Sequence, residues 1–175
     1  MANQRLTDKT ALNEQVGSGD LLMVVDVNDT TGSSAGTSKK QDFKYLMQTD
    51  KISVSNAEID LNSNPKTLVG ALSGYMITVY NVTILTTQDA ADESSNASLM
   101  FTYDTSVTTN FWLEFRRFMN TVSTNASFCF SPSPSSTGTC KTSLLNKPFS
   151  LQSSADFNGG WSAEVYVTYA YTKVL

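Results

Sequence analysis

The sequence predicts a mainly β protein: an antiparallel β-sandwich or jelly-roll-like domain over residues 51–175, preceded by a small strand-loop-helix attachment arm over residues 1–50. Two observations carry this prediction. First, about seven or eight short segments with alternating apolar residues are separated by turn-forming clusters, which is typical of sandwiches and barrels. Second, only 16% of residues are charged, and Thr, Val, Tyr and Phe, which favour strands, are plentiful.

The arm is predicted from residues 19–40, which read GDLLMVVDVNDTTGSSAGTSKK. The apolar run at 21–25 suits one strand buried on both faces. Asp26, Asn28 and Asp29 then favour turns in which a side chain bonds its own backbone, and Gly32 and Gly36 supply positions where φ can be positive. Residues 39–47 place apolar side chains at helical spacing and predict a short amphipathic helix.

Polar residues dominate the stretch before this strand, at 1–18, which looks like an arm without a core of its own. The strand, loop and helix are also too few to bury much apolar area alone. We therefore expect the arm to attach to a partner through an apolar set comprising Leu21, Leu22, Val24, Val25, Phe43 and Leu46.

This segment resembles one that recurs near the N-termini of tailed-bacteriophage virion appendages, including tail fibres, head fibres and capsid-decorating proteins. The resemblance covers about residues 17–47 and does not extend to the remainder. It implies a structural virion protein that binds a major capsid or tail protein and forms a homo-oligomer, most commonly a trimer. It identifies no catalytic residue.

Within the β-domain, the segment from Tyr75 to Leu85 is a long predicted strand whose apolar parity shifts, so a bulge is expected near Asn81. Residues 111–119 fit a strand, in which Phe111, Leu113 and Phe115 alternate, or a helix, in which Phe111, Phe115 and Phe118 share one side; the aromatic content and the neighbouring strands favour the strand. Residues 161–175 are the clearest strand of the chain.

Composition and charge exclude several classes of function. The net charge of −4 and the pI near 4.7 argue against a nucleic-acid partner. No apolar run is long enough to cross a bilayer, and the N-terminus lacks a signal-peptide core. We therefore expect a soluble protein made in the host cytoplasm and carried in the virion, with no membrane partner.

Catalytic signals are weak. The sequence has no histidine, which removes the usual triads and the commonest general base, so no enzyme activity, cofactor or metal is predicted. Asp89, Asp92 and Glu93 lie in a hydrophilic stretch and are expected to be solvated charges. A calcium site at 26–29 is a weaker interpretation than a strand-ending Asx turn.

Cys129 and Cys140 flank the turn-rich segment SPSPSSTG. The alternatives are a disulfide, which a hairpin-like loop permits, or two buried thiols, which synthesis in the cytoplasm favours. Trp112 and Trp161 stand for a set of aromatic residues that could stack against host glycans or line an interface. Most such residues are expected in the core or a subunit interface.

Taken together, these observations predict a non-enzymatic phage virion protein that attaches by its N-terminal segment and displays a β-domain, as a capsid decoration or head fibre. The alternative is a tail-fibre or receptor-binding subunit that recognises host surface glycans.

Overall fold

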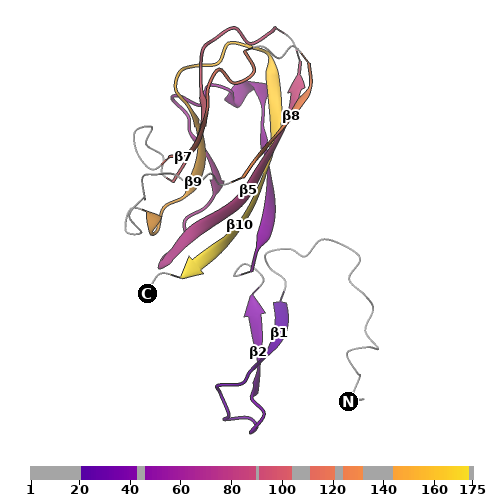
Figure 1. Cartoon of the computed structure of the whole chain (residues 1–175), viewed down its shortest axis with the longest axis vertical. Coiled ribbons are helices and arrows are strands. Elements are labelled where there is room, and N and C mark those ends of the chain that lie inside the picture. Colours follow the sequence, from indigo (N-terminus) through magenta and orange to yellow (C-terminus); the bar gives the residue numbers. More distant parts are fainter. Residues whose placement is uncertain are drawn as a thin grey trace. The chain divides into compact units, whose positions relative to one another are not determined.

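The computed structural model describes residues 21–42, 46–89, 91–103, 111–120, 124–131 and 144–173 (Figure 1). The chain divides into two compact units, with the division between residues 44 and 45. The described part is mainly β, as predicted, and its strands pair in antiparallel fashion throughout.

The first unit contains a two-stranded hairpin, β1 (Leu21–Asp26) and β2 (Thr37–Asp42). Met23 lies opposite Lys40 in the register, and Val24 lies opposite Lys39. The helix predicted over 39–47 is therefore wrong, because its first residues belong to a strand. Pairing with β2 satisfies backbone groups that β1 would otherwise leave without a partner.

The second unit holds two four-stranded sheets. One has the order β3-β10-β5-β8, from β3 (Gln48–Val54), β10 (Trp161–Lys173), β5 (Tyr75–Gln88) and β8 (Ala126–Phe130). The other has the order β4-β9-β6-β7, from β4 (Lys66–Val69), β9 (Phe149–Ser153), β6 (Leu99–Thr102) and β7 (Phe111–Phe115). A short 3-10 turn, η3 (Asn56–Glu58), follows β3.

Each of the first four strands of this unit pairs with one of the last four, in reverse order along the chain. β3 pairs with β10, β4 with β9, β5 with β8 and β6 with β7, so the first half of the domain folds back along the second half. Two further pairings, β10 with β5 and β6 with β9, join these couples into the two sheets. β3 begins at Gln48, so this strand crosses the boundary expected between residues 50 and 51.

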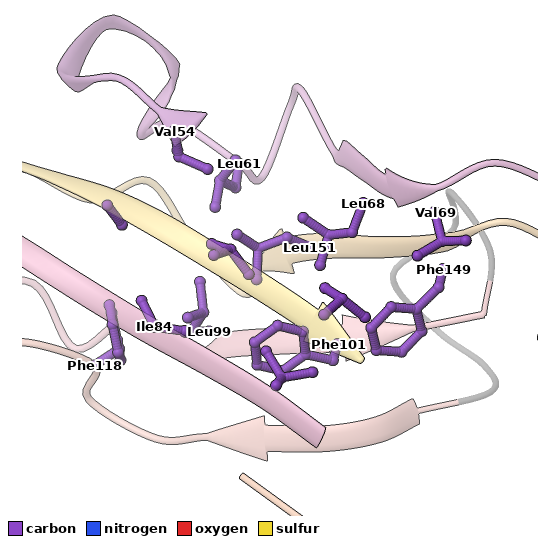
Figure 2. Close-up of a cluster of buried hydrophobic side chains, with 14 of the residues drawn as sticks. Val54, Leu61, Leu68, Val69, Ile84, Leu99, Phe101, Phe118, Phe149 and Leu151 are labelled. Carbon is purple, nitrogen blue, oxygen red and sulfur yellow. The ribbon is translucent and has the colours of Figure 1, made fainter. Parts of the chain in front are cut away.

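One hydrophobic core is shared by the two sheets, which is consistent with a β-sandwich (Figure 2). Ile84 comes from the first sheet, while Phe101, Phe149 and Leu151 come from the second. Phe101 and Phe149 stack with ring centroids 6.0 Å apart. All the residues of this core belong to the second unit.

Alternation in the two longest strands agrees with the sequence. Val165, Val167 and Tyr169 of β10 all point into the core, as expected. On β5, the register with β10 shifts where Thr168 pairs with Asn81 and Tyr169 with Val79, which confirms the predicted bulge near Asn81. The shift lets residues on both sides of the bulge reach the same core.

The ambiguous segment at 111–119 begins as a strand, β7, and then turns. Arg117 and Met119 adopt positive φ angles of 54° and 63°, which is uncommon for residues other than glycine. The turn buries Phe118 and Met119 almost completely. Burial of these two side chains is the compensation for the strained backbone beside them.

Candidate functional site: an apolar β-hairpin

The hairpin of the first unit exposes apolar side chains on both of its faces. The exposed fractions are 41% for Leu22, 73% for Met23, 39% for Val24 and 56% for Val25. Successive residues of a strand point to opposite faces, so no face of β1 is polar throughout. The expectation that this strand is buried on both faces is therefore wrong, because the described side chains from Leu22 to Val25 are all exposed.

The two strands of the hairpin differ sharply in character. β1 reads LLMVVD and β2 reads TSKKQD. Charged residues, lysine above all, commonly protect the free edge of a sheet, whereas continuous apolar runs belong to strands buried on both faces. β2 therefore has the sequence of an edge strand, and β1 has the sequence of a strand that is buried on both faces.

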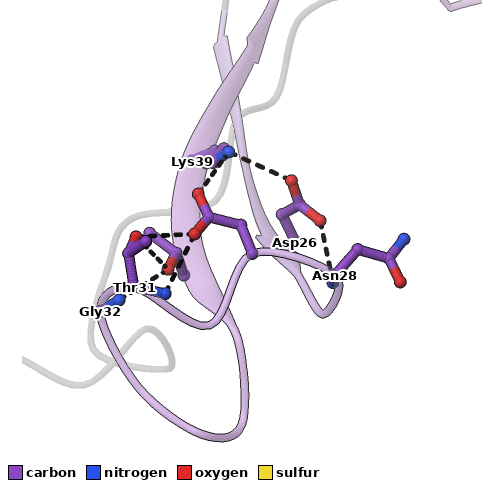
Figure 3. A network of polar contacts seen from close by, with 7 residues as sticks. Asp26, Asn28, Thr31, Gly32 and Lys39 are labelled. Atoms are coloured by element: carbon purple, nitrogen blue, oxygen red, sulfur yellow. Dashed lines mark hydrogen bonds and ion pairs between the residues drawn. The ribbon is translucent and has the colours of Figure 1, made fainter.

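The loop that joins the two strands is held by a compact polar network (Figure 3). The Asp29 carboxylate accepts hydrogen bonds from the Thr31 backbone N–H at 3.0 Å and from the Thr31 hydroxyl at 2.6 Å. The Asp26 carboxylate accepts one from the Asn28 N–H at 3.1 Å. These are the Asx turns that the sequence predicted, formed by the two aspartates.

Lys39 joins this network to β2. Its Nζ lies 2.7 Å from Asp29 Oδ2 and 3.1 Å from Asp26 Oδ2. Lys39 and then the Thr31 hydroxyl lower the pKa of Asp29 to about 2, and Lys39 likewise lowers the pKa of Asp26. An ammonium group thus occupies the position between these carboxylates that a cation would take in the calcium interpretation.

Glycine is required at one point of the loop. Gly36 has a φ of 117°, and a Cβ there would lie 2.8 Å from the Asp26 carbonyl oxygen. Gly32, by contrast, does not adopt a positive φ, so the sequence prediction holds for Gly36 and is wrong for Gly32. The loop therefore has a defined conformation, which keeps the two strands in one register.

The predicted attachment residues are only partly brought together. Leu22, Val24 and Val25 lie on the hairpin, whereas Leu46 is half-buried in the second unit. The backbone of Leu21 is in β1, but its side chain and all of Phe43 lie outside the described residues. Two exposed side chains were missed, Met23 and Val27.

A hollow of about 380 Å³ is lined by Leu22, Met23, Ser38, Lys39 and Lys40. The sequence did contain a signal for Met23. Strict alternation along a strand places Met23 on the face opposite Leu22 and Val24, which indicates that both faces of β1 are apolar.

A second candidate is the Glu93 carboxylate in the sandwich, because this side chain is only 2% exposed. The expectation that Glu93 is a solvated charge is therefore wrong. Its oxygens accept hydrogen bonds from the Ser95 N–H at 2.8 Å, the Gly159 N–H at 2.9 Å and the Trp161 Nε1–H at 3.2 Å. The Asn158 N–H adds a further bond at 3.2 Å.

The hydrogen bonds between residues 93–95 and residues 158–161, here called the Glu93 clamp, run in both directions. The Asn158 side-chain oxygen accepts bonds from the backbone N–H groups of Ser94 and Ser95, at 3.0 and 3.1 Å. Burial would raise the pKa of Glu93, but the hydrogen bonds from Ser95, Gly159 and Trp161 outweigh it and hold the pKa below its usual value. A carboxylate whose oxygens are this fully occupied ties two loops together, and it has no free oxygen with which to act on a ligand.

A third candidate is a polar groove of about 290 Å³ on the first sheet. It is lined by Ser53, Val54, Ser55, Glu58, Thr87, Ser162, Ala163 and Glu164. Both carboxylates are ionised and paired: Glu58 with Lys66, and Glu164 with Lys51. The groove presents hydroxyls and carboxylates with no aromatic ring in its lining.

The remaining site residues have mixed outcomes. Trp161 is only 1% exposed, so the core interpretation holds for it and its ring is not available to a glycan. The side chain of Trp112 lies outside the described residues.

Cys129 carries an exposed thiol that accepts a bond from Asn81 Nδ2 at 3.2 Å, so the buried-thiol alternative is wrong for this residue. Cys140 lies outside the described residues, and the disulfide stays a prediction.

No family model, curated protein or solved structure matches this chain. In the part of the chain that the structure describes, no group of three or more Cys, Asp or Glu side chains is placed to hold a metal ion. No helix there is long and apolar enough to cross a membrane. The geometry of the hairpin is therefore the principal basis for a functional assignment.

Proposed function

We propose that this chain is a non-enzymatic structural protein of a tailed-phage virion, which attaches by its N-terminal hairpin and displays the sandwich on the particle surface as a capsid decoration or head fibre. The observation that carries the proposal is the exposure of apolar side chains on both faces of the hairpin, in a chain whose second unit has its own core. An isolated two-stranded hairpin is marginal in water, so this one needs a partner.

The same residues carry the resemblance to phage appendages. The segment 17–47 that resembles virion attachment regions includes both strands of the hairpin and its pinned loop. The turn chemistry of the quoted sequence, with Asp26, Asp29 and Gly36, corresponds to specific contacts in the loop. The resemblance and the surface properties therefore point to one region and one role.

The strand order of the second unit supports the proposal at the level of fold. Nested pairing of eight strands into two four-stranded sheets is the order expected of a double-sheet jelly roll. That architecture is used by viral capsid and lectin domains, among others. Because one fold hosts many functions, the strand order is only secondary support, and the proposal rests mainly on the hairpin.

The anchoring partner in this proposal is a major capsid or tail protein, and the appendage is a homotrimer, as the resemblance implies. Burial of apolar area contributes about 25 cal/mol per Å² removed from water. Leu22, Val24 and Val25 are among the side chains whose exposure leaves such area available. Docking through them needs no charged partner, which suits a hairpin whose Lys39 is already neutralised.

The experiment compares particles assembled with different versions of the chain. Purified particles carrying Val25→Lys should contain roughly tenfold less of this protein than wild type, because the substitution places a charge in the buried contact. Leu85→Lys is the matched control, since Leu85 is also exposed, at 40%, but lies in the sandwich. Immunogold labelling then places the wild-type protein on the head or the tail.

Two outcomes would contradict the proposal. One is absence of the wild-type chain from purified particles. The other is normal incorporation of Val25→Lys, which would mean that the attachment surface lies elsewhere.

The alternative function, a tail-fibre or receptor-binding subunit that recognises host glycans, is favoured by the polar groove. Its hydroxyls and carboxylates are groups that bond to sugar hydroxyls, and Ser53, Thr87 and Glu164 lie in its lining. Glycan-array binding by the full chain that is abolished by Glu164→Gln would favour this alternative. Even labelling over the head, with no glycan binding, would favour decoration.

A further inference from the structure

The Glu93 clamp holds the only asparagine of the chain that is followed by glycine, Asn158 before Gly159. At such a pair the backbone nitrogen of the second residue can attack the side-chain amide of the first. Glycine favours this attack, because it has no Cβ to hinder the approach and its backbone turns freely. Asn158 is exposed and Gly159 is half-buried, so water reaches the pair.

The reaction at this pair is deamidation, and it needs no co-reactant other than water. The Gly159 nitrogen forms a bond to Cγ of Asn158, the bond from Cγ to Nδ2 breaks, and Nδ2 leaves as ammonia with the proton that the Gly159 nitrogen gives up. Water then opens the cyclic imide at either carbonyl carbon. The product is aspartate, or isoaspartate if the main chain now runs through the side chain, and either one replaces a neutral amide by a carboxylate.

Glu93 holds the attacking nitrogen away from this reaction. The Gly159 N–H donates to Glu93 Oε2 at 2.9 Å, and the Asn158 N–H donates to the same oxygen at 3.2 Å. Two successive N–H groups bonded to one oxygen fix the peptide between them, whereas the attack requires this peptide to turn. Burial raises the pKa of Glu93, but the hydrogen bonds lower it below its usual value, so the carboxylate is a poor base for the Gly159 proton.

The amide of Asn158 is held by the other loop. Its Oδ1 accepts hydrogen bonds from the backbone N–H groups of Ser94 and Ser95, at 3.0 and 3.1 Å. Its Nδ2 donates to the Ser94 hydroxyl at 3.1 Å. Bonds to both ends of the amide fix the direction of Cγ. Ring closure therefore requires these bonds and the bonds to Glu93 to open together.

We infer that Asn158 is a deamidation site that the Glu93 clamp keeps closed, and that opening of the clamp commits the site to an irreversible change. The product opposes reclosure. The Ser95 N–H is shared by Glu93 Oε1, at 2.8 Å, and Asn158 Oδ1, at 3.1 Å, so a carboxylate at position 158 would place two negative charges around one donor. The inference concerns the sandwich and does not depend on the role of the hairpin.

The test follows deamidation of Asn158 in the purified full chain, by peptide mapping with mass spectrometry at mildly alkaline pH. Asn158 should react about a hundredfold or more slowly in the folded chain than in the same chain unfolded in urea, because several hydrogen bonds to a charged group must open first. Equal rates in the two states would overturn the inference.

Glu93→Gln tests whether the clamp or the fold as a whole protects the site. The substitution removes the charge and one acceptor oxygen, so the folded variant should deamidate at Asn158 roughly tenfold faster than wild type. Val167→Ala is the matched control: Val167 is fully buried in the core and lies outside residues 158–161, so its loss lowers global stability and should leave the rate unchanged. An unchanged rate for Glu93→Gln, or an equal increase for Val167→Ala, would overturn the inference.

Hydrogen exchange keeps the inference testable if Glu93→Gln does not fold. In the wild-type chain, protection of the Gly159 amide against exchange measures how rarely the clamp opens. Folding should slow deamidation of Asn158 by at least the factor by which it slows this exchange. A Gly159 amide that exchanges at its unprotected rate, or deamidation that is slowed much less than exchange, would contradict protection by the clamp.

Discussion

Valine occupies opposite environments in the two compact units. Val165 and Val167 on β10 are fully buried, whereas Val24 and Val25 on β1 are exposed. Both pairs lie in antiparallel strands, so the difference comes from the layer above each strand. The second unit has two sheets that share one core, whereas the described residues of the first unit form a single two-stranded sheet.

The comparison assigns separate tasks to the two units. Interactions inside the sandwich should determine stability, and those in the hairpin should determine association. Each substitution below should change either the stability of the sandwich or association through the hairpin. A substitution that changed both would contradict this division.

The largest expected effect is at the Glu93 clamp. Glu93→Ala leaves the buried Trp161 indole N–H and the half-buried backbone N–H groups of Ser95 and Gly159 without this acceptor. The free energy of unfolding should fall by about 3 kcal/mol or more. Urea unfolding of the full chain measures it, with Asp92→Ala as control because Asp92 is exposed. An unchanged midpoint for Glu93→Ala would mean that the clamp is dispensable.

Gly159→Ala is next, since a Cβ at this position would lie 2.8 Å from Glu93 Cα. Neither backbone can move away without disturbing the clamp, so the expected loss is about 1–3 kcal/mol. Gly70→Ala is the matched control, because no atom lies within 4 Å of its added Cβ. Equal unfolding midpoints for the two variants would contradict the close approach of the two loops.

A substitution in the hairpin should show the reverse pattern. Gly36→Ala forces a side chain into a φ of 117° and against the Asp26 carbonyl, a strain of roughly 1–3 kcal/mol confined to the loop. Particle incorporation and association should weaken, while the thermal transition of the sandwich stays in place. Gly32→Ala is the milder comparison, because Gly32 does not adopt a positive φ and its added Cβ would meet the Thr37 side chain, at 3.2 Å, and no backbone atom is among its nearest contacts.

The smallest effect expected is a pH dependence of the sandwich. Lys66, then the backbone and hydroxyl of Ser55, lower the pKa of Glu58 from its usual value near 4.5 to about 2. A group whose pKa is lower in the folded state stabilises the fold above its unfolded pKa and loses that contribution as the pH falls. Stability should therefore decline between about pH 4.5 and 2, and Glu58→Gln should flatten the decline.

Alternation along single strands is what the sequence predicted well. The inward set on β10 and the bulge near Asn81 both follow from local apolar parity, because one face of each strand packs on the core. The β2 strand was missed because its residues are polar on both faces, so the sequence shows no alternation of apolar and polar residues there.

The Glu93 clamp could not be found from the sequence either. Its donors at 158, 159 and 161 are backbone or indole N–H groups more than 60 residues away, and the acidic stretch around it reads as solvated loop. The exposed hairpin has a different lesson. The continuous apolar run at 21–25 predicted a strand correctly, but the burial on both faces that such a run favours is wrong, because Leu22, Val24 and Val25 are exposed.

The measurement that tests the division of tasks most directly is thermal unfolding of the chain without residues 1–44, which removes the hairpin and keeps all of β3. The remaining sandwich should retain a β-type circular dichroism spectrum and one cooperative transition, and it should be missing from particles. A truncated chain that is unfolded would contradict the claim that the sandwich holds its own core, and one that still enters particles would contradict the role of the hairpin.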